Sequence, residues 1–267
     1  YNSSRIVAGP TTTLMEDTLN GQIFGPGAYM LWNDTVYAEA ALYFPLSHNF
    51  DQAVGLPLHD RYIAPIPFWH LAFEHEFNHH EQYVQFGTFG ARADRQPRGD
   101  TTTGMRDRIT DIGVEANYQL MEDLHNMVSA HATYIHEDQN LQASHALGNA
   151  TNMSNNLDTF SADVTYTIDD TWVPSVQYFR TSGSDDTLLY GAGFTNNRPN
   201  SQGFTMDLAY VPFGKPNSSV LWGNARLAVQ YTAYTEFNGT SRNASDNNIL
   251  FINFVAALAP LVSLTSE

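Results

Sequence analysis

The densest group of side chains that could bind a metal ion or carry protons lies in one short stretch of the chain. Its members are His70, Glu74, His75, Glu76, His79, His80 and Glu81. Imidazole and carboxylate groups at this density suit Zn²⁺ or Cu²⁺ and suit proton transfer. If residues 64–77 form a β-strand, His70 and His75 lie on opposite faces, and the last two histidines fall in a tight turn. The metal candidates are His70, His75, His79 and His80. The alternative interpretation is a polar wall that leads into a solvated turn.

A second set of charged residues lies at positions that alternate with apolar ones. Its members are Asp111, Glu115, Asp163, Asp207, Arg226 and Glu236. If these residues line a water-filled lumen, a mainly acidic lining would raise the local cation concentration and select for cations. The alternative interpretation is that they only solvate the interior.

No motif in the chain predicts an enzyme. The sequence contains no Ser/His/Asp constellation with a local signature, no glycine-rich phosphate loop and no paired-carboxylate signature. Cysteine is absent, which excludes a Cys nucleophile, a thiolate metal site and covalently attached c-type haem. We therefore predict no catalytic residue and no cofactor.

The elements that must position these side chains are β-strands, because a period-two alternation of apolar and polar residues recurs about ten times. In residues 112–120 every second residue is apolar and the residues between are small or polar. Such a strand has one apolar and one polar face. Comparable runs cover residues 34–45, 64–77, 82–92, 107–120, 124–137, 156–168, 171–183, 201–213, 221–237 and 248–258, with a weaker one at 22–32.

The links between these runs are alternately short and long. Short links fall near residues 78–80, 121–123, 169–170 and 214–219. Long links rich in Asn, Asp, Gly, Ser and Thr fall at residues 47–62, 93–105, 138–155, 182–200 and 238–247. This rhythm predicts an all-β fold, an antiparallel up-and-down transmembrane β-barrel with short turns on one side of the membrane and long loops on the other.

The predicted barrel is a single domain over residues 1–267, with about 12 strands in this chain, or up to 16 if N-terminal residues are missing. Bacterial single-chain barrels have an even number of strands. A further outward-running strand is therefore expected before residues 22–32, and residues 2–13 are its candidate. No run of about 18 apolar residues exists, so no transmembrane helix is predicted. A soluble β-barrel with its apolar face inward would show the same alternation.

Composition favours the membrane interpretation. The chain has 14 Tyr and 16 Phe, many of them near predicted strand ends, where aromatic girdles meet the bilayer interfaces. A cysteine-free barrel suits the outer membrane of a Gram-negative bacterium. The net charge of −16 argues against nucleic acid as a partner.

Several stretches are similar to those of one known family. They are residues 199–204 (Pro-Asn-Ser-Gln-Gly-Phe), 207–213, 227–239 and 242–248, with earlier matches at 32–37, 87–90, 110–113 and 132–137. They resemble proteobacterial outer-membrane β-barrel proteins, porin-like, whose genes lie beside those of multihaem c-type cytochromes. The resemblance implies a pore-forming sleeve for electron-transfer cytochromes and carries over no catalytic residue. Family members typically end in an aromatic closing strand, whereas here residues 248–254 are followed by further residues through Glu267.

Three functions remain open from the sequence. The first is an outer-membrane pore for ions or small solutes. The second is a haem-free structural sleeve or docking partner for multihaem cytochromes in electron transfer across the outer membrane. The third is a soluble β-barrel binding protein. The expected partners are outer-membrane lipid, a multihaem c-type cytochrome and further copies of the chain.

Overall fold

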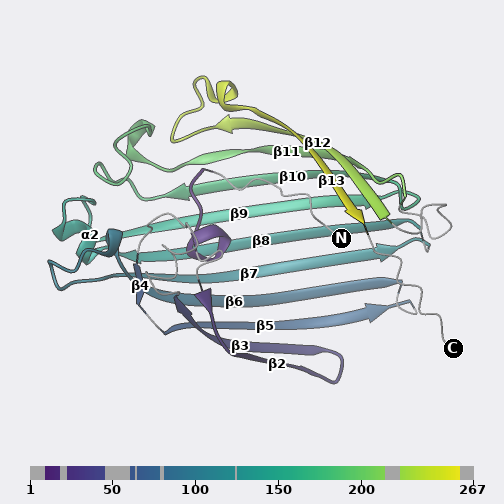
Figure 1. The fold of residues 1–267 in the computed structure, drawn as a ribbon, viewed down its shortest axis with the longest axis horizontal. Helices are drawn as coiled ribbons and strands as arrows, with labels where there is room; N and C mark the ends of the chain where they lie inside the picture. The colour runs from purple at the N-terminus through teal and green to yellow at the C-terminus, as the bar shows by residue number, and fades with distance from the viewer. Residues whose placement is uncertain are drawn as a thin grey trace.

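The computed structural model of the protein describes residues 10–18, 23–45, 61–63, 65–78, 81–123, 125–213 and 223–258. These residues form one antiparallel sheet (Figure 1). Its strands are β1 (Ile23–Phe24), β2 (Gly27–Trp32), β3 (Val36–Pro45), β4 (Arg61–Ile63), β5 (Ile66–Phe77), β6 (Gln82–Gln96), β7 (Asp107–Met121), β8 (Met127–Asn140), β9 (Ser154–Thr167), β10 (Trp172–Gly183), β11 (Ser201–Tyr210), β12 (Gly223–Glu236) and β13 (Ile249–Leu258).

Strands that follow one another along the chain are neighbours in the sheet. β1 and β2 both pair with β3, and β4 pairs with β6 beyond the end of β5. Each of these two couples is one interrupted strand, so the thirteen strands fill eleven positions. Every predicted run coincides with one of these positions. The all-β, antiparallel, up-and-down prediction is thereby confirmed, while closure of the sheet into a barrel is not seen in the described part of the chain.

The connections alternate in length as predicted. Tight turns join β5 to β6, β7 to β8 and β9 to β10, and they lie together at one end of the strands (Figure 1). The left-handed residues Asp169 and Asp170, with φ of 51° and 52°, form the β9–β10 turn. Asp tolerates this conformation, which matches the twist of a two-residue hairpin. At the other end lie long loops, which include helix α2 (Gln142–Ala146).

Side chains on the two faces of the sheet differ in chemistry and in exposure. On β11 the apolar residues Phe204, Met206 and Leu208 are 42–56% exposed, whereas Thr205 and Asp207 on the other face are 2% and 6% exposed. The first face, which also carries Val164 and Val229, is called the apolar face below. The second, which carries most of the charged residues, is called the inner face.

A short N-terminal segment lies against the inner face. It consists of residues 10–13 followed by the π-helical turn η1 (Leu14–Thr18), and Figure 1 shows it in front of the central strands. Leu14 is buried in an apolar cluster with Tyr62, Ile109, Leu141 and other residues near the long loops. The prediction of a strand over residues 2–13 is therefore wrong for residues 10–13. Residues 2–9 lie outside the described residues.

Candidate functional site: the polar inner face

The inner face of β7 carries a row of acidic residues spaced four apart. Asp107, Asp111 and Glu115 follow one another from the long-loop end toward the tight turns. Because a strand rises about 3.3 Å per residue, neighbouring carboxylates of this row lie about 13 Å apart along it. Each of the three has a different set of partners, and each therefore has a different role in the wall.

Asp107 fixes the loop above the sheet. Its Oδ2 accepts a hydrogen bond from Ser144 Oγ at 2.5 Å and its Oδ1 accepts one from the Ser144 backbone N–H at 2.9 Å. Arg95 Nε lies 3.6 Å from the same carboxylate. Asp107 is fully buried, so these partners replace the hydrogen bonds to water that its side chain loses on burial. We assign Asp107 to the anchoring of helix α2.

Asp111 and Glu137 hold the N-terminal segment. The two residues stand directly opposite each other on β7 and β8. Glu137 Oε2 accepts a hydrogen bond from the Leu14 N–H at 2.6 Å, and Asp111 Oδ2 accepts one from the Met15 N–H at 2.9 Å. Both carboxylates are almost fully buried. The segment thus covers this part of the wall, and its backbone N–H groups bond to this pair of carboxyl groups.

Glu115 pairs with a histidine two strands away. His70 Nε2 on β5 lies 2.8 Å from Glu115 Oε1 on β7, so the pair reaches across β6. Gly87 of β6 lies between them, and a Cβ atom there would stand 3.0–3.1 Å from both groups. A side chain at this position would crowd the pair, which explains the glycine.

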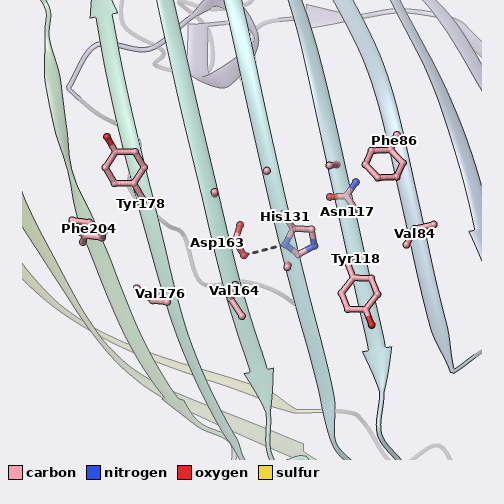
Figure 2. Close-up of a pocket in the computed structure, with 14 residues that line it drawn as sticks. Val84, Phe86, Asn117, Tyr118, His131, Asp163, Val164, Val176, Tyr178 and Phe204 are labelled. Atoms are coloured by element: carbon pink, nitrogen blue, oxygen red, sulfur yellow. Dashed lines mark hydrogen bonds and ion pairs between the residues drawn. The ribbon is translucent and has the colours of Figure 1, made fainter.

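Two further polar pairs continue the wall toward the tight turns. His131 Nδ1 lies 3.1 Å from Asp163 Oδ2 (Figure 2), and Asn117 donates to Gln85 at 2.5 Å. They border a cavity of about 630 Å³. Its lining consists of Glu76, Glu81, Tyr83, Gln85, Asn117, Gln119, Met121 and His131. A polar, acidic hollow of this size has room for hydrated cations or small polar solutes.

The remaining predicted lumen residues lie on β11 and β12. Asp207 and Arg226 form an ion pair on the inner face, with 3.4 Å between Oδ1 and Nη2. The register between β11 and β12 shifts near the long-loop end of the two strands. Glu236 stands opposite Gln202 beyond that shift. Gln202 accepts a hydrogen bond from the hydroxyl of Tyr178, a residue of the apolar face. Glu236 therefore lies apart from the other five, because a bulge reverses the faces of the residues after it.

The histidines predicted as metal ligands do not converge in the described part of the chain. His70 is on the inner face, while the His75 ring packs edge-on against Phe77, with 4.4 Å between ring centroids. His79 and His80 lie outside the described residues. Among the residues that the structure describes, no group of three His, Asp or Glu side chains could hold a metal ion.

The apolar face has a shallow hollow of its own. It measures about 580 Å³ and lies over β6 to β11 (Figure 2). Small side chains at Ala116, Ala132 and Ala162 form its floor, and larger ones such as Phe86 and Tyr178 form its border. Because its lining is almost entirely apolar, the hollow suits hydrocarbon and not a polar ligand.

Asp186 connects two of the long loops, the one between β8 and β9 and the one between β10 and β11. Burial opposes ionisation of this side chain, but backbone N–H groups of Thr151, Leu189 and Asn152 and the amide of Asn155 donate to it at 2.8–3.1 Å. These bonds outweigh the burial and lower the pKa of Asp186 to about 2. Two long loops therefore share one ionised carboxylate as their anchor.

Sequence reasoning missed the role of the N-terminal segment and of Glu137. Glu137 shares the inner parity of His131 and Thr133 on β8, and this parity was the available signal. Nothing in the sequence around Leu14 indicates that it packs against residues more than a hundred positions away.

No protein-family model, curated protein or solved structure matches the chain. The resemblance to cytochrome-associated barrels therefore stays a hypothesis. Within the described residues, no helix has the length and apolar character needed to span a membrane.

Proposed function

We propose that this chain is an outer-membrane β-barrel pore that passes cations or small polar solutes along its inner face. The observation that supports this most strongly is the reversed polarity of the two faces. Large apolar side chains are exposed on one face of β7 to β12, while carboxylates, amides and hydroxyls are buried on the other. A soluble β-protein buries the first group and exposes the second. Exposed apolar area of this extent is typical of contact with lipid or a partner.

The dimensions of the apolar face suit a bilayer. Along β9 and the residue that follows it, this face runs from Phe160 to Ile168, which is about 27 Å along the chain before tilt is considered. The apolar band of outer-membrane barrels is about 25 Å tall. Beyond the band, toward the long-loop end, the same face becomes polar. There His136 bonds to Asp158, and the Tyr134 hydroxyl donates to the same carboxylate. Such a change of polarity is what an interface between hydrocarbon and water would require.

The inner face supports a preference for cations. Glu115, Asp163 and Asp207 all lie on it, where they pair with His70, His131 and Arg226 respectively. Carboxylates that line a confined aqueous path raise the concentration of cations there. The role of these residues in selectivity is a prediction from their placement.

Conductance in a planar bilayer tests the proposal. Purified protein should insert and give discrete steps, and a salt gradient should give a reversal potential of the sign for cation preference. Protein that remains in the aqueous phase beside lipid vesicles, with no conductance, would overturn the pore and favour a soluble binding protein.

A further inference from the structure

A small cavity lies between the N-terminal segment and the inner face. Its volume is about 260 Å³, and it shares no lining residue with the polar cavity near the tight turns. At about 30 Å³ for each water molecule, it has room for about nine waters or for a ligand of similar size. Its lining consists of Met15, Glu16, Phe68, His70, Phe89, Glu115 and Ile135.

A glycine shapes the apolar part of this cavity. Gly113 on β7 stands directly opposite Phe89 of β6 and Ile135 of β8, and all three lie on the inner face. A Cβ atom at Gly113 would stand 2.3 Å from the Phe89 ring. The ring therefore lies where a side chain of residue 113 would otherwise be, and this position requires glycine.

The polar part of the cavity is a histidine–carboxylate pair that is held from several sides. His70 Nε2 lies 2.8 Å from Glu115 Oε1. The His70 ring also packs against Tyr37 and edge-on against Phe89, with 5.3 Å and 6.2 Å between ring centroids. The second oxygen of Glu115, Oε2, accepts no hydrogen bond from the residues that the structure describes. A fixed carboxylate thus keeps one oxygen for a ligand.

The N-terminal segment covers the other side of the cavity. The Met15 N–H donates to Asp111 Oδ2 at 2.9 Å, which places the Met15 side chain beside the wall. Glu16 Oε2 accepts a hydrogen bond from the Thr13 N–H at 3.0 Å, so the carboxylate of Glu16 is held at the same turn. The cavity is therefore complete only while the segment lies on the wall.

The lining favours a ligand that is positively charged and has an apolar surface. Two carboxylates border the cavity, and its lining contains no Lys or Arg. The two phenyl rings attract a cation at short range, and Met15 and Ile135 offer it apolar contact. A metal ion requires several polar ligands, and no group of three His, Asp or Glu side chains in the described part of the chain could hold one.

We propose that this cavity binds a small organic ammonium ion. Its charge lies toward Glu115 Oε2, and its methyl or methylene groups contact Phe68 and Phe89. Because the lining combines the segment with the wall, a bound ion stabilises the segment in its covering position. The inference goes beyond the proposed function, since binding requires the segment and the wall but no conduction.

A titration with tetramethylammonium chloride tests the proposal on the full chain in detergent. Ligand-observed nuclear magnetic resonance follows the methyl signal, which should show saturable binding. The neutral molecule tert-butanol, which is similar in size and shape, should bind much more weakly, because it lacks the charge. Sodium chloride at the same concentration should not displace the probe, since a hydrated sodium ion cannot use the apolar lining.

Two variants locate the binding. Glu115→Gln keeps the shape of the side chain and removes its charge, and Phe89→Leu removes one ring. Each should weaken binding about 5- to 30-fold, because each removes one source of attraction for the cation. Asp163→Asn is the matched control for the charge, since Asp163 also pairs with a histidine on the inner face. Phe86→Leu is the control for the ring, because Phe86 lies exposed on the apolar face of the same strand as Phe89. Circular dichroism verifies the fold of each variant, and Glu115→Gln decides alone if Phe89→Leu does not fold.

Four outcomes would overturn the proposal. Equal binding of tert-butanol would show an apolar cavity without selection for charge. Displacement by sodium chloride would show general attraction of cations to an acidic surface. Unchanged affinity in the folded variants, or equal loss in the controls, would place the probe elsewhere on the protein.

The same samples separate this inference from the proposed function. Saturable binding to protein that gives no conductance would refute the pore and keep the ligand site. Conductance by protein that shows no saturable binding would refute the ligand site and keep the pore.

Discussion

In the proposed pore, release of the N-terminal segment should widen the path, because residues 11–16 cover part of the inner face. The perturbation is the double variant Asp111→Asn with Glu137→Gln, which keeps side-chain shape and removes the charge of the pair that accepts the Leu14 and Met15 N–H groups. Because these two buried carboxyl groups stand directly opposite each other, the pair carries one negative charge and not two. A hydrogen bond to a charged group contributes about 1.5–3 kcal/mol, and a neutral one about 0.5–1.5 kcal/mol. Loss of this one charge therefore weakens the binding of the segment by about 1–1.5 kcal/mol.

This loss corresponds to a shift of about 5- to 13-fold toward the released state. The assay is single-channel recording, in which the double variant should show a higher open probability or a larger unitary conductance. Leu14→Ala provides an independent perturbation, because it removes a fully buried apolar anchor instead of a charge. Asp163→Asn is the matched control, since Asp163 is an inner-face carboxylate that bonds to His131.

If both release variants fold and conduct like the parent protein, the segment does not obstruct conduction. The N-terminal segment would then be a fixed part of the wall and no barrier to conduction. The prediction is also wrong if the control changes conductance as much as the double variant, because the effect would then follow from the loss of any inner charge.

Three further predictions concern the lipid contact, the lumen charge and the loops. Val164→Arg on the apolar face should destabilise the protein in vesicles by about 2–4 kcal/mol in urea unfolding, whereas Ser161→Arg on the inner face of the same strand should cost much less; equal costs would refute the assignment of the faces. Neutralising Glu115 and Asp163 together should reduce cation preference, measured as a smaller reversal potential. The pKa of Asp186 is lowered to about 2 from an ordinary value near 4, so its contribution of about 2 kcal/mol is complete above about pH 4 and is lost as the pH falls toward 2. Protease cleavage of the long loops should rise over that interval, and Asp186→Asn should abolish the pH dependence.

The positions of the strands could be predicted because their signal is local. Alternation within about ten residues indicates each strand. Residues that tolerate positive φ, such as Asp169 and Asp170, indicate a tight turn. The ends of the strands are harder to predict where polar residues continue a strand. β8 extends to Asn140, beyond the last apolar residue of its predicted run, because backbone pairing with β9 continues there.

The candidate site could be predicted as a face and not as a set of contacts. Parity along β7 placed Asp111 and Glu115 on the same side, which the structure shows. The partner of each depends on the register between strands and on what covers the face. His70 reaches Glu115 only because Gly87 leaves room between them, and no pattern within one strand encodes that approach.

The alternation within one strand does not show which face of the sheet turns outward, because a soluble sandwich and a membrane barrel have the same alternation. Exposure resolves which face turns outward in this sheet, and β11 shows it most clearly, with Met206 exposed beside buried Asp207. The edge strand β13 has a different pattern from β11. Apart from Asn253, β13 is apolar on both faces, which is the pattern of a strand covered on both sides.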